Sequence, residues 1–107
     1  MPSTKTRAEI LELVKQAVEQ VDPEARVILF GSRARGDAKE DSDWDFLILT
    51  PSELSVKEQQ KYSYPIYGLN FELEQNFSVF FFSKSKWEAG ASPSPLYDNI
   101  RREGIEL

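Results

Sequence analysis

The chain has 107 residues, of which 40% are hydrophobic and 29% charged, and its formal net charge is −5 at pH 7. This length suffices for one domain with one core, so we expect a single domain over residues 1–107. The sequence contains no cysteine and no histidine, which excludes disulfides and imidazole or thiolate ligands and nucleophiles. Any metal would sit on oxygen ligands, which favours Mg²⁺ or Mn²⁺. The acidic charge disfavours long nucleic acids as partners.

The sequence gives no sign of membrane insertion or export. It contains no run of about 18 apolar residues, so we expect no membrane-spanning helix. The first residues, Met1 to Lys5, lack the apolar stretch of a secretory signal. These features predict a cytoplasmic protein without a membrane partner.

The first predicted elements are a helix and a strand. Residues 6–21 carry apolar side chains at the 3.6-residue period of a helix. Thr6 and Glu9 have the spacing of a capping box at its start, and Pro23 follows its end. Residues 25–30 form a short, strongly apolar run, which predicts a strand buried on both faces.

A polar loop over residues 31–42 comes next, with a helical turn expected at 32–35. Residues 44–50 are apolar again and predict a second strand, which Pro51 ends.

The stretch 52–75 is more ambiguous. Ser55 and Glu58 again have capping-box spacing, which favours a helix. Pro65 and Gly68 argue for a break or kink within it.

The remaining residues predict a strand at 77–82, a helical turn at 83–87 and a last helix at 95–103, closed by Gly104. The order of elements indicates a small α/β (α+β) domain, with a mixed sheet of three to four strands flanked by helices.

Two carboxylates open the second predicted strand. Asp43 and Asp45 are two residues apart, so their side chains point to the same face, and Trp44 and Phe46 point to the other. Two carboxylates on one face repel each other unless a positive charge lies between them. A divalent cation with oxygen ligands meets that requirement.

The loop before this strand suits a triphosphate. Gly31 lets the backbone approach a phosphate without a Cβ in the way, and Ser32 offers a hydroxyl and an amide hydrogen. Arg33 and Arg35 are available to neutralise phosphate charge. Arg33 is the stronger candidate because it adjoins Ser32.

These residues form a Gly-Ser pair, a gap of ten residues and an Asp-x-Asp pair. With this pattern the chain resembles the DNA polymerase β-type nucleotidyltransferase superfamily, and within it the minimal nucleotidyltransferase group. The resemblance implies that Gly31, Ser32 and Arg33 bind the nucleotide and that Asp43 and Asp45 are catalytic and hold Mg²⁺ or Mn²⁺. It also implies the nucleotidyltransferase fold.

The resemblance further implies transfer of a nucleoside monophosphate, AMP from ATP in the leading interpretation, to a hydroxyl on a protein partner. Several members of the group are encoded beside a HEPN-domain protein, for which they act as antitoxin. A HEPN-domain or other helical protein is therefore the expected partner.

One feature departs from the family pattern. Members usually carry a third carboxylate on a later strand, where this chain has Ser78. A serine is not a base near neutral pH without an activating partner. Glu72 and Glu74 lie upstream, but they fit better on the polar side of a helix. The loss puts turnover in question more than nucleotide binding, since Mg²⁺ often takes only one or two protein carboxylates.

Two alternatives therefore stay open. The chain is either an enzyme or a catalytically impaired module that acts by docking on a partner. Transfer to a small molecule, as in aminoglycoside-modifying relatives, would need a second subunit, which leaves a homodimer open.

The aromatic set Phe77, Phe80, Phe81 and Phe82 is expected in the core, and tyrosines 62, 64, 67 and 97 are candidates for a partner surface.

Overall fold

The computed structural model describes residues 5–107; Met1 to Thr4, within the segment expected to lack a secretory signal, lie outside the described residues. The elements in chain order are α1 (Arg7–Val21), β1 (Arg26–Phe30), α2 (Ser32–Arg35), β2 (Trp44–Thr50), α3 (Val56–Leu73), β3 (Phe77–Ser83), α4 (Lys84–Glu88), α5 (Pro95–Glu103) and β4 (Ile105–Glu106). None of the helices within residues 5–107 is both long and apolar enough to span a bilayer.

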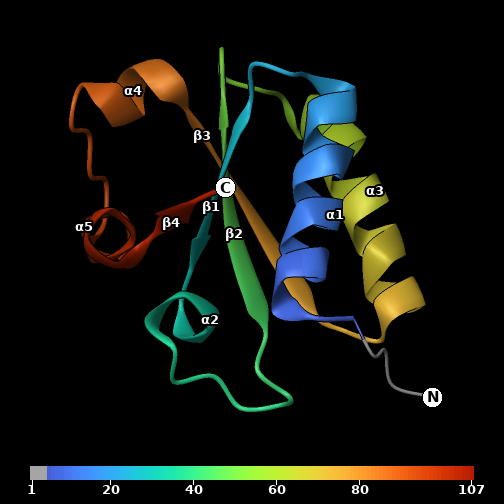
Figure 1. Cartoon of the computed structure of the whole chain (residues 1–107). Coiled ribbons are helices and arrows are strands. Elements are labelled where there is room, and N and C mark those ends of the chain that lie inside the picture. Colours follow the sequence, from blue (N-terminus) through green and yellow to red (C-terminus); the bar gives the residue numbers. More distant parts are fainter. Residues whose placement is uncertain (1–4) are drawn as a thin grey trace.

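A four-stranded sheet in the order β3-β2-β1-β4 forms the centre of the fold. β1 runs antiparallel to β2 and to β4, whereas β2 and β3 are parallel. Helices α1 and α3 cover one face of this sheet, and α5 crosses the other (Figure 1). The expected mixed sheet flanked by helices is thus confirmed.

The two faces of the sheet carry two cores. The larger core joins the sheet to α1 and α3, and it contains Ile10, Val14, Val18, Ala25, Val27, Leu29, Trp44, Phe46, Ile48, Tyr62, Ile66, Leu73 and Phe77. The smaller core joins the sheet to α5, and it contains Ile28, Phe30, Leu47, Leu49 and Ile100. Alternate residues of β1 and β2 belong to different cores, because successive side chains of a strand point to opposite faces.

Both capping boxes that the sequence predicts are formed. The Thr6 hydroxyl accepts the Glu9 amide at 3.2 Å, and the Ser55 hydroxyl accepts the Glu58 amide at 3.2 Å. In each case the glutamate carboxylate accepts the amide of the capping residue in return. These contacts satisfy amides that have no partner within the helix.

Of the break or kink expected near Pro65 and Gly68, the break is wrong, because α3 runs continuously from Val56 to Leu73, and the kink stays a prediction. Ile66 and Leu73 are buried in the larger core on either side of Gly68. Burial of this face outweighs the hydrogen bond that the proline removes, which is how tertiary packing overrides a local propensity.

The sequence did not predict β4. Its two residues pair with Ile28 and Leu29 of β1, and the amide of Leu107 donates to the Val27 carbonyl at 2.9 Å. A strand of two residues has no periodicity that a sequence pattern could reveal. β4 nevertheless ties the end of α5 to the sheet.

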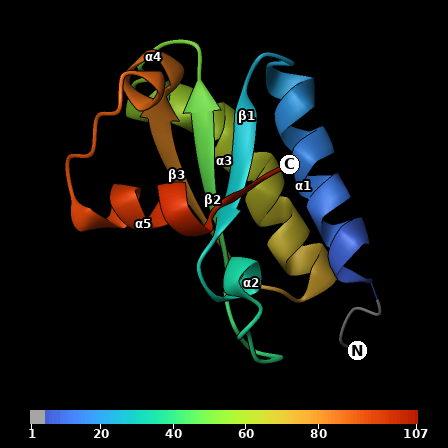
Figure 2. The ribbon, with the colours of Figure 1, turned by 60° about the vertical axis from the view of Figure 1, so that its left-hand side comes forward.

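The strand directions bring the functional segments to one end of the sheet. Because β1 and β2 are antiparallel, the end of β1 lies beside the start of β2, and Phe30 pairs with Asp45. α2 follows β1 at that end, below the sheet in Figure 2. Because β2 and β3 are parallel, Ser78 lies beside Asp45 on the neighbouring strand.

Candidate functional site

Gly31 and Asp45 make the contact at the centre of the site. Gly31 has φ +77° and ψ −159°, a conformation that is essentially restricted to glycine. A Cβ at this position would lie 2.3 Å from Oδ2 of Asp45. Only a residue without a side chain leaves this carboxylate room against the backbone.

Helix α2 starts immediately after Gly31. The Gly31 carbonyl accepts the amides of Ala34 and Arg35 at 3.0 Å each, and Gly36 ends the helix in the left-handed conformation with φ +86°. The first amides of a helix have no acceptor within it, so those of Ser32 and Arg33 are available to an outside acceptor. The turn expected at residues 32–35 is confirmed.

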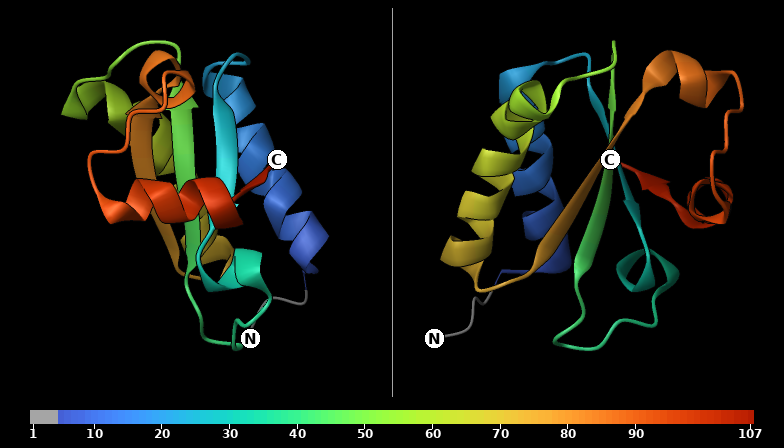
Figure 3. Two further views of the ribbon diagram at one scale, coloured as in Figure 1. Left: turned by 90° about the vertical axis from the view of Figure 1, so that its left-hand side faces the viewer. Right: turned by 180° about the vertical axis from the view of Figure 1, so that it is seen from behind.

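A cavity of about 400 Å³ joins these elements. It brings together four of the five residues that the sequence singled out, namely Gly31, Ser32, Asp43 and Asp45. Its lining is completed by Phe30, Arg35, Ser42, Leu96, Asn99 and Glu103. The last three come from α5, which lies across the sheet just above α2 (Figure 3, left). No local pattern marks them, because only the return of the chain over the sheet brings α5 to this end.

Arg33, the fifth candidate, is not among the residues that line the cavity. Its guanidinium donates to the Ser42 carbonyl from Nη2 at 2.9 Å and from Nε at 3.3 Å, and to the Glu40 carbonyl at 3.1 Å. It also lies 4.4 Å from the centre of the Trp44 ring. In this arrangement Arg33 fastens the loop that leads to Asp43, and its predicted contact with the nucleotide stays a prediction.

Arg35 is the arginine that lines the cavity. It forms ion pairs with Asp37 and with Glu103 of α5, each at 3.2 Å. Hydrogen bonds to these two carboxylates raise the pKa of Arg35 above its usual value. The pair with Glu103 links α5 to the segment after β1, and it holds the guanidinium of Arg35 in the lining of the cavity.

Asp45 is half-buried, and its pKa is raised above the usual value of an aspartate. Burial is the largest cause, the nearby charge of Asp43 adds to it, and Arg35 acts in the opposite direction. Ionising Asp45 therefore costs more free energy in the folded protein than in water, and a bound cation would lower that cost.

Strand β3 itself carries no carboxylate. Ser78 lies beside Asp45 in the register of the parallel strands. Within residues 5–107 no three acidic side chains are grouped as a metal site. Glu74 follows α3 as its cap residue, is exposed, and is not among the residues that line the cavity. Two carboxylates still fit a cation such as Mg²⁺, which completes its shell with water and phosphate oxygens.

The aromatic side chains of β3 mostly pack as expected. Phe77 is buried between Trp44 and Phe46, and Phe81 contacts Tyr62. Phe80 departs from this pattern: it is 39% exposed and rests against Phe30, on the sheet face that also carries Asp45.

The chain matches known proteins over most of its length. Residues 9–105 match the family model described as "Nucleotidyltransferase domain". A curated protein of Methanocaldococcus jannaschii, named "Putative protein adenylyltransferase MJ0141", is 47% identical over 58 residues. That match takes in 50% of this chain and 59% of the relative, so less than two thirds of the relative's length is represented.

Solved structures share the fold. One, described as a "putative minimal nucleotidyltransferase", is 26% identical with a TM-score of 0.61, over 98% of this chain and 100% of its own. Another, described as a toxin-antitoxin with AMP-PNP, has a TM-score of 0.65 and 16% identity, over 89% of this chain and 69% of its own.

Replacing Gly31 tests the central contact. We expect Gly31→Ala to lose about 1–3 kcal/mol of folding free energy from backbone strain and to displace the Asp45 carboxylate. Thermal unfolding measures the first effect, and calorimetric titration with ATP and Mg²⁺ measures the second as lost binding. Gly36→Ala is the matched control: it has the same sign of φ, but a Cβ there meets no atom within 4 Å. Equal loss of ATP binding in both variants would contradict the role of the contact.

The raised pKa of Asp45 predicts how stability depends on pH. A carboxyl group whose pKa is higher in the folded state destabilises that state progressively as the pH rises above its unfolded pKa, and the effect is complete above its folded pKa. We expect Asp45→Asn to raise the melting temperature at pH 7, with the gain shrinking to nothing below the ordinary value of 3.8. Scanning calorimetry across this range checks the prediction. A gain that is equal at all pH values would exclude titration of Asp45 as its cause.

Proposed function

The chain belongs to the nucleotidyltransferase domain family, and from this membership we propose that it transfers a nucleoside monophosphate, AMP from ATP, to a hydroxyl group on a protein partner. The observation that carries the proposal is the cavity in which Asp45 lies against Gly31, with Asp43, Ser32 and Arg35 around it. Its negative and positive groups suit the metal-bound triphosphate that such a transfer uses.

Each residue has a distinct task in this proposal. Asp43 and Asp45 would hold a divalent cation, Mg²⁺ or Mn²⁺, which when bound neutralises triphosphate charge and polarises the reacting phosphoryl group. Gly31 lets the backbone approach the β- and γ-phosphates, and Ser32 donates its hydroxyl and amide hydrogens to them. Arg35 lines the cavity and adds positive charge.

The reaction follows from this placement. The acceptor oxygen attacks the α-phosphorus of ATP, the bond from that phosphorus to the bridging oxygen breaks, and pyrophosphate leaves. The acceptor hydroxyl gives up its proton in the same step. Orientation of the two reactants and stabilisation of phosphate charge account for most of the catalysis in transfers of this kind.

The proton acceptor is assigned to Glu103. Ser78 is not among the residues that line the cavity, whereas Glu103 lines it from α5. Its carboxylate is bound by Arg35 in this structure. A triphosphate that takes over Arg35 would release Glu103 toward the acceptor, so substrate binding and base availability would be coupled.

A protein acceptor is favoured over a small molecule. The structural relative described as a toxin-antitoxin with AMP-PNP joins the same fold to a protein assembly and to an ATP analogue. A HEPN-domain protein, or another helical partner, is the acceptor that the family resemblance favours.

Labelled ATP tests the transfer directly. Incubation of the protein, a candidate partner, Mg²⁺ and ATP labelled at the α-phosphate should move label onto the partner, and Asp43→Asn should abolish this. Calorimetry should show loss of Mg²⁺-dependent ATP binding in the same variant. Asp41→Asn is the matched control, because Asp41 is exposed in the same loop and does not line the cavity.

The docking alternative rests on one observation, the serine beside Asp45. If the protein acts by docking, it neutralises its partner without transferring label, and Asp43→Asn retains that neutralisation. If it acts as an enzyme, label transfer and neutralisation are lost together.

Glu103→Gln tests the assignment of the base. We expect transfer to fall by about 10²–10⁴-fold, while the affinity for ATP is unchanged or rises because Arg35 is less firmly held. Single-turnover kinetics and calorimetry separate these two quantities. Parallel losses of ATP binding and transfer would show instead that Glu103 only positions Arg35. Glu106→Gln, at an exposed glutamate of β4, controls for loss of charge at this end of the chain.

A further inference from the structure

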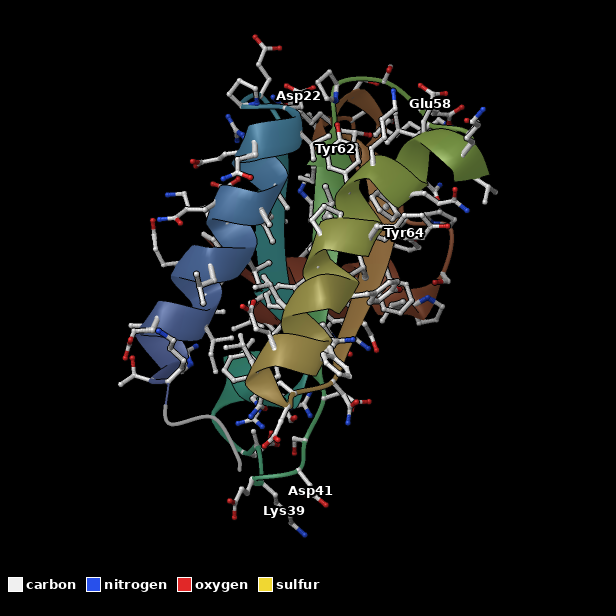
Figure 4. The ribbon with its side chains drawn as sticks, turned by 90° about the vertical axis from the view of Figure 1, so that its right-hand side faces the viewer. Asp22, Lys39, Asp41, Glu58, Tyr62 and Tyr64 are labelled. Carbon is white, nitrogen blue, oxygen red and sulfur yellow. The ribbon has the colours of Figure 1, made fainter. Side chains whose placement is uncertain are left out.

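Helix α3 has two apolar faces, and only one of them is used inside the domain. Tyr62 and Ile66 are buried toward the sheet and α1, whereas Tyr64, Tyr67 and Phe71 are 63%, 44% and 91% exposed. Figure 4 looks onto the α1 and α3 layer, with Tyr62 between the two helices and Tyr64 on the side of α3 away from α1. Three large aromatic rings along one side of a helix form an apolar surface that water covers poorly.

The neighbouring helix shows that this is not a general property of the layer. The outward positions of α1 carry polar side chains: Glu12, Gln16, Glu19 and Gln20 are all exposed. Gln16 and Glu12 also form a hydrogen bond with each other at 3.2 Å. Within the layer of α1 and α3, the exposed aromatic residues are therefore specific to α3.

The exposed side of α3 has the spacing of a helix-pairing surface. Residues that alternate at intervals of three and four lie on one stripe of a helix, as in coiled coils. On α3 this stripe contains Lys57, Gln60, Tyr64, Tyr67 and Phe71. Glu74 caps the helix in the left-handed conformation and lines a hollow together with Tyr67 and Phe71, and these six residues are called the α3 seam below. Pro65 lies about 100° round the helix from Tyr64, so its ring is outside the seam.

Two copies of the seam complement each other when the two helices run antiparallel. It begins with a lysine and ends with a glutamate, and both side chains are exposed. In an antiparallel pair of α3 helices Lys57 would face the partner's Glu74, Gln60 would face the partner's Phe71, and Tyr64 would face the partner's Tyr67. A parallel pair would instead place like charges together at both ends, which is unfavourable.

We propose that the α3 seam binds a second copy of this chain, as an antiparallel, two-fold symmetric dimer. A two-fold axis uses the same surface on both subunits, so each charge complementarity occurs twice and the contact closes on itself. The tyrosine pair lies next to the axis, where rigid aromatic side chains contribute most to association.

The size of the helix sets the strength of this dimer. Its 18 residues give a length of about 27 Å, and a contact of that length falls below about 1,200 Å² of total buried area. Each copy also carries a net charge of −5. The dimer should therefore be reversible and should strengthen when salt screens the repulsion between the two copies.

The arrangement leaves the cavity open. α3 covers one face of the sheet, whereas α5, which lines the cavity, crosses the opposite face (Figure 1). The inference thus does not rest on the proposed transfer reaction, and the two can fail separately.

Sedimentation velocity of the full chain, from micromolar to millimolar concentration, tests the proposal. We expect a monomer–dimer equilibrium, which Phe71→Asp abolishes without lowering the melting temperature, since Phe71 is almost fully exposed. Glu19→Lys on the outer side of α1 is the control and should leave the dimerisation constant unchanged.

Charge reversal tests the antiparallel register. Lys57→Glu places two carboxylates opposite each other at both ends of the seam and should weaken the dimer about tenfold. Adding Glu74→Lys to the same chain restores opposite charges and should restore the constant. A chain that is monomeric at every concentration, or a dimer that resists Phe71→Asp, overturns the proposal. A dimer that the double variant fails to rescue overturns the register.

Discussion

The carboxylate of Asp45 lies against the backbone of Gly31, and most of this structure is arranged around that contact. It requires a residue without a Cβ at the end of β1 and a carboxylate at the second position of β2. It also requires the antiparallel register in which Phe30 pairs with Asp45. A shift of one residue would turn Asp45 into the larger core and Phe46 out of it. The apolar side chains on both faces of the sheet thus fix the geometry of the polar site.

The loop between these strands is held by two arginines with different tasks. Arg33 binds backbone carbonyls of the loop and covers Trp44, so it holds the loop that positions Asp43. Arg35 reaches across to Glu103 and so brings α5 into the site. Asp45 is partly desolvated and has an acidic neighbour, and its pKa is raised in consequence. A bound cation would relieve this unfavourable electrostatic interaction between the two carboxylates.

The two faces of the sheet have different roles in the molecule. The face under α5 carries the carboxylates and the cavity, and there the single serine beside Asp45 marks the departure from the family pattern. The face under α1 and α3 carries the larger core. On its outer side α3 presents aromatic residues that the domain itself does not need for packing. A small domain has little surface to spare, so an apolar helix face of this kind points to association.

The sequence alone determined the order of the elements, the capping of α1 and α3, and the pairing of a Gly-Ser turn with an Asp-x-Asp strand, because each depends on residues close together in the chain. It could not reveal that α5 returns to the site with Glu103, since Glu103 lies 58 positions after Asp45 in the chain. Nor could it separate Arg33 from Arg35, because adjacency to Ser32 does not say where a long side chain points. The continuity of α3 through Pro65 and the addition of β4 were likewise decided by packing in three dimensions. Burial energy gained between distant segments outweighed the local preferences that the sequence displays.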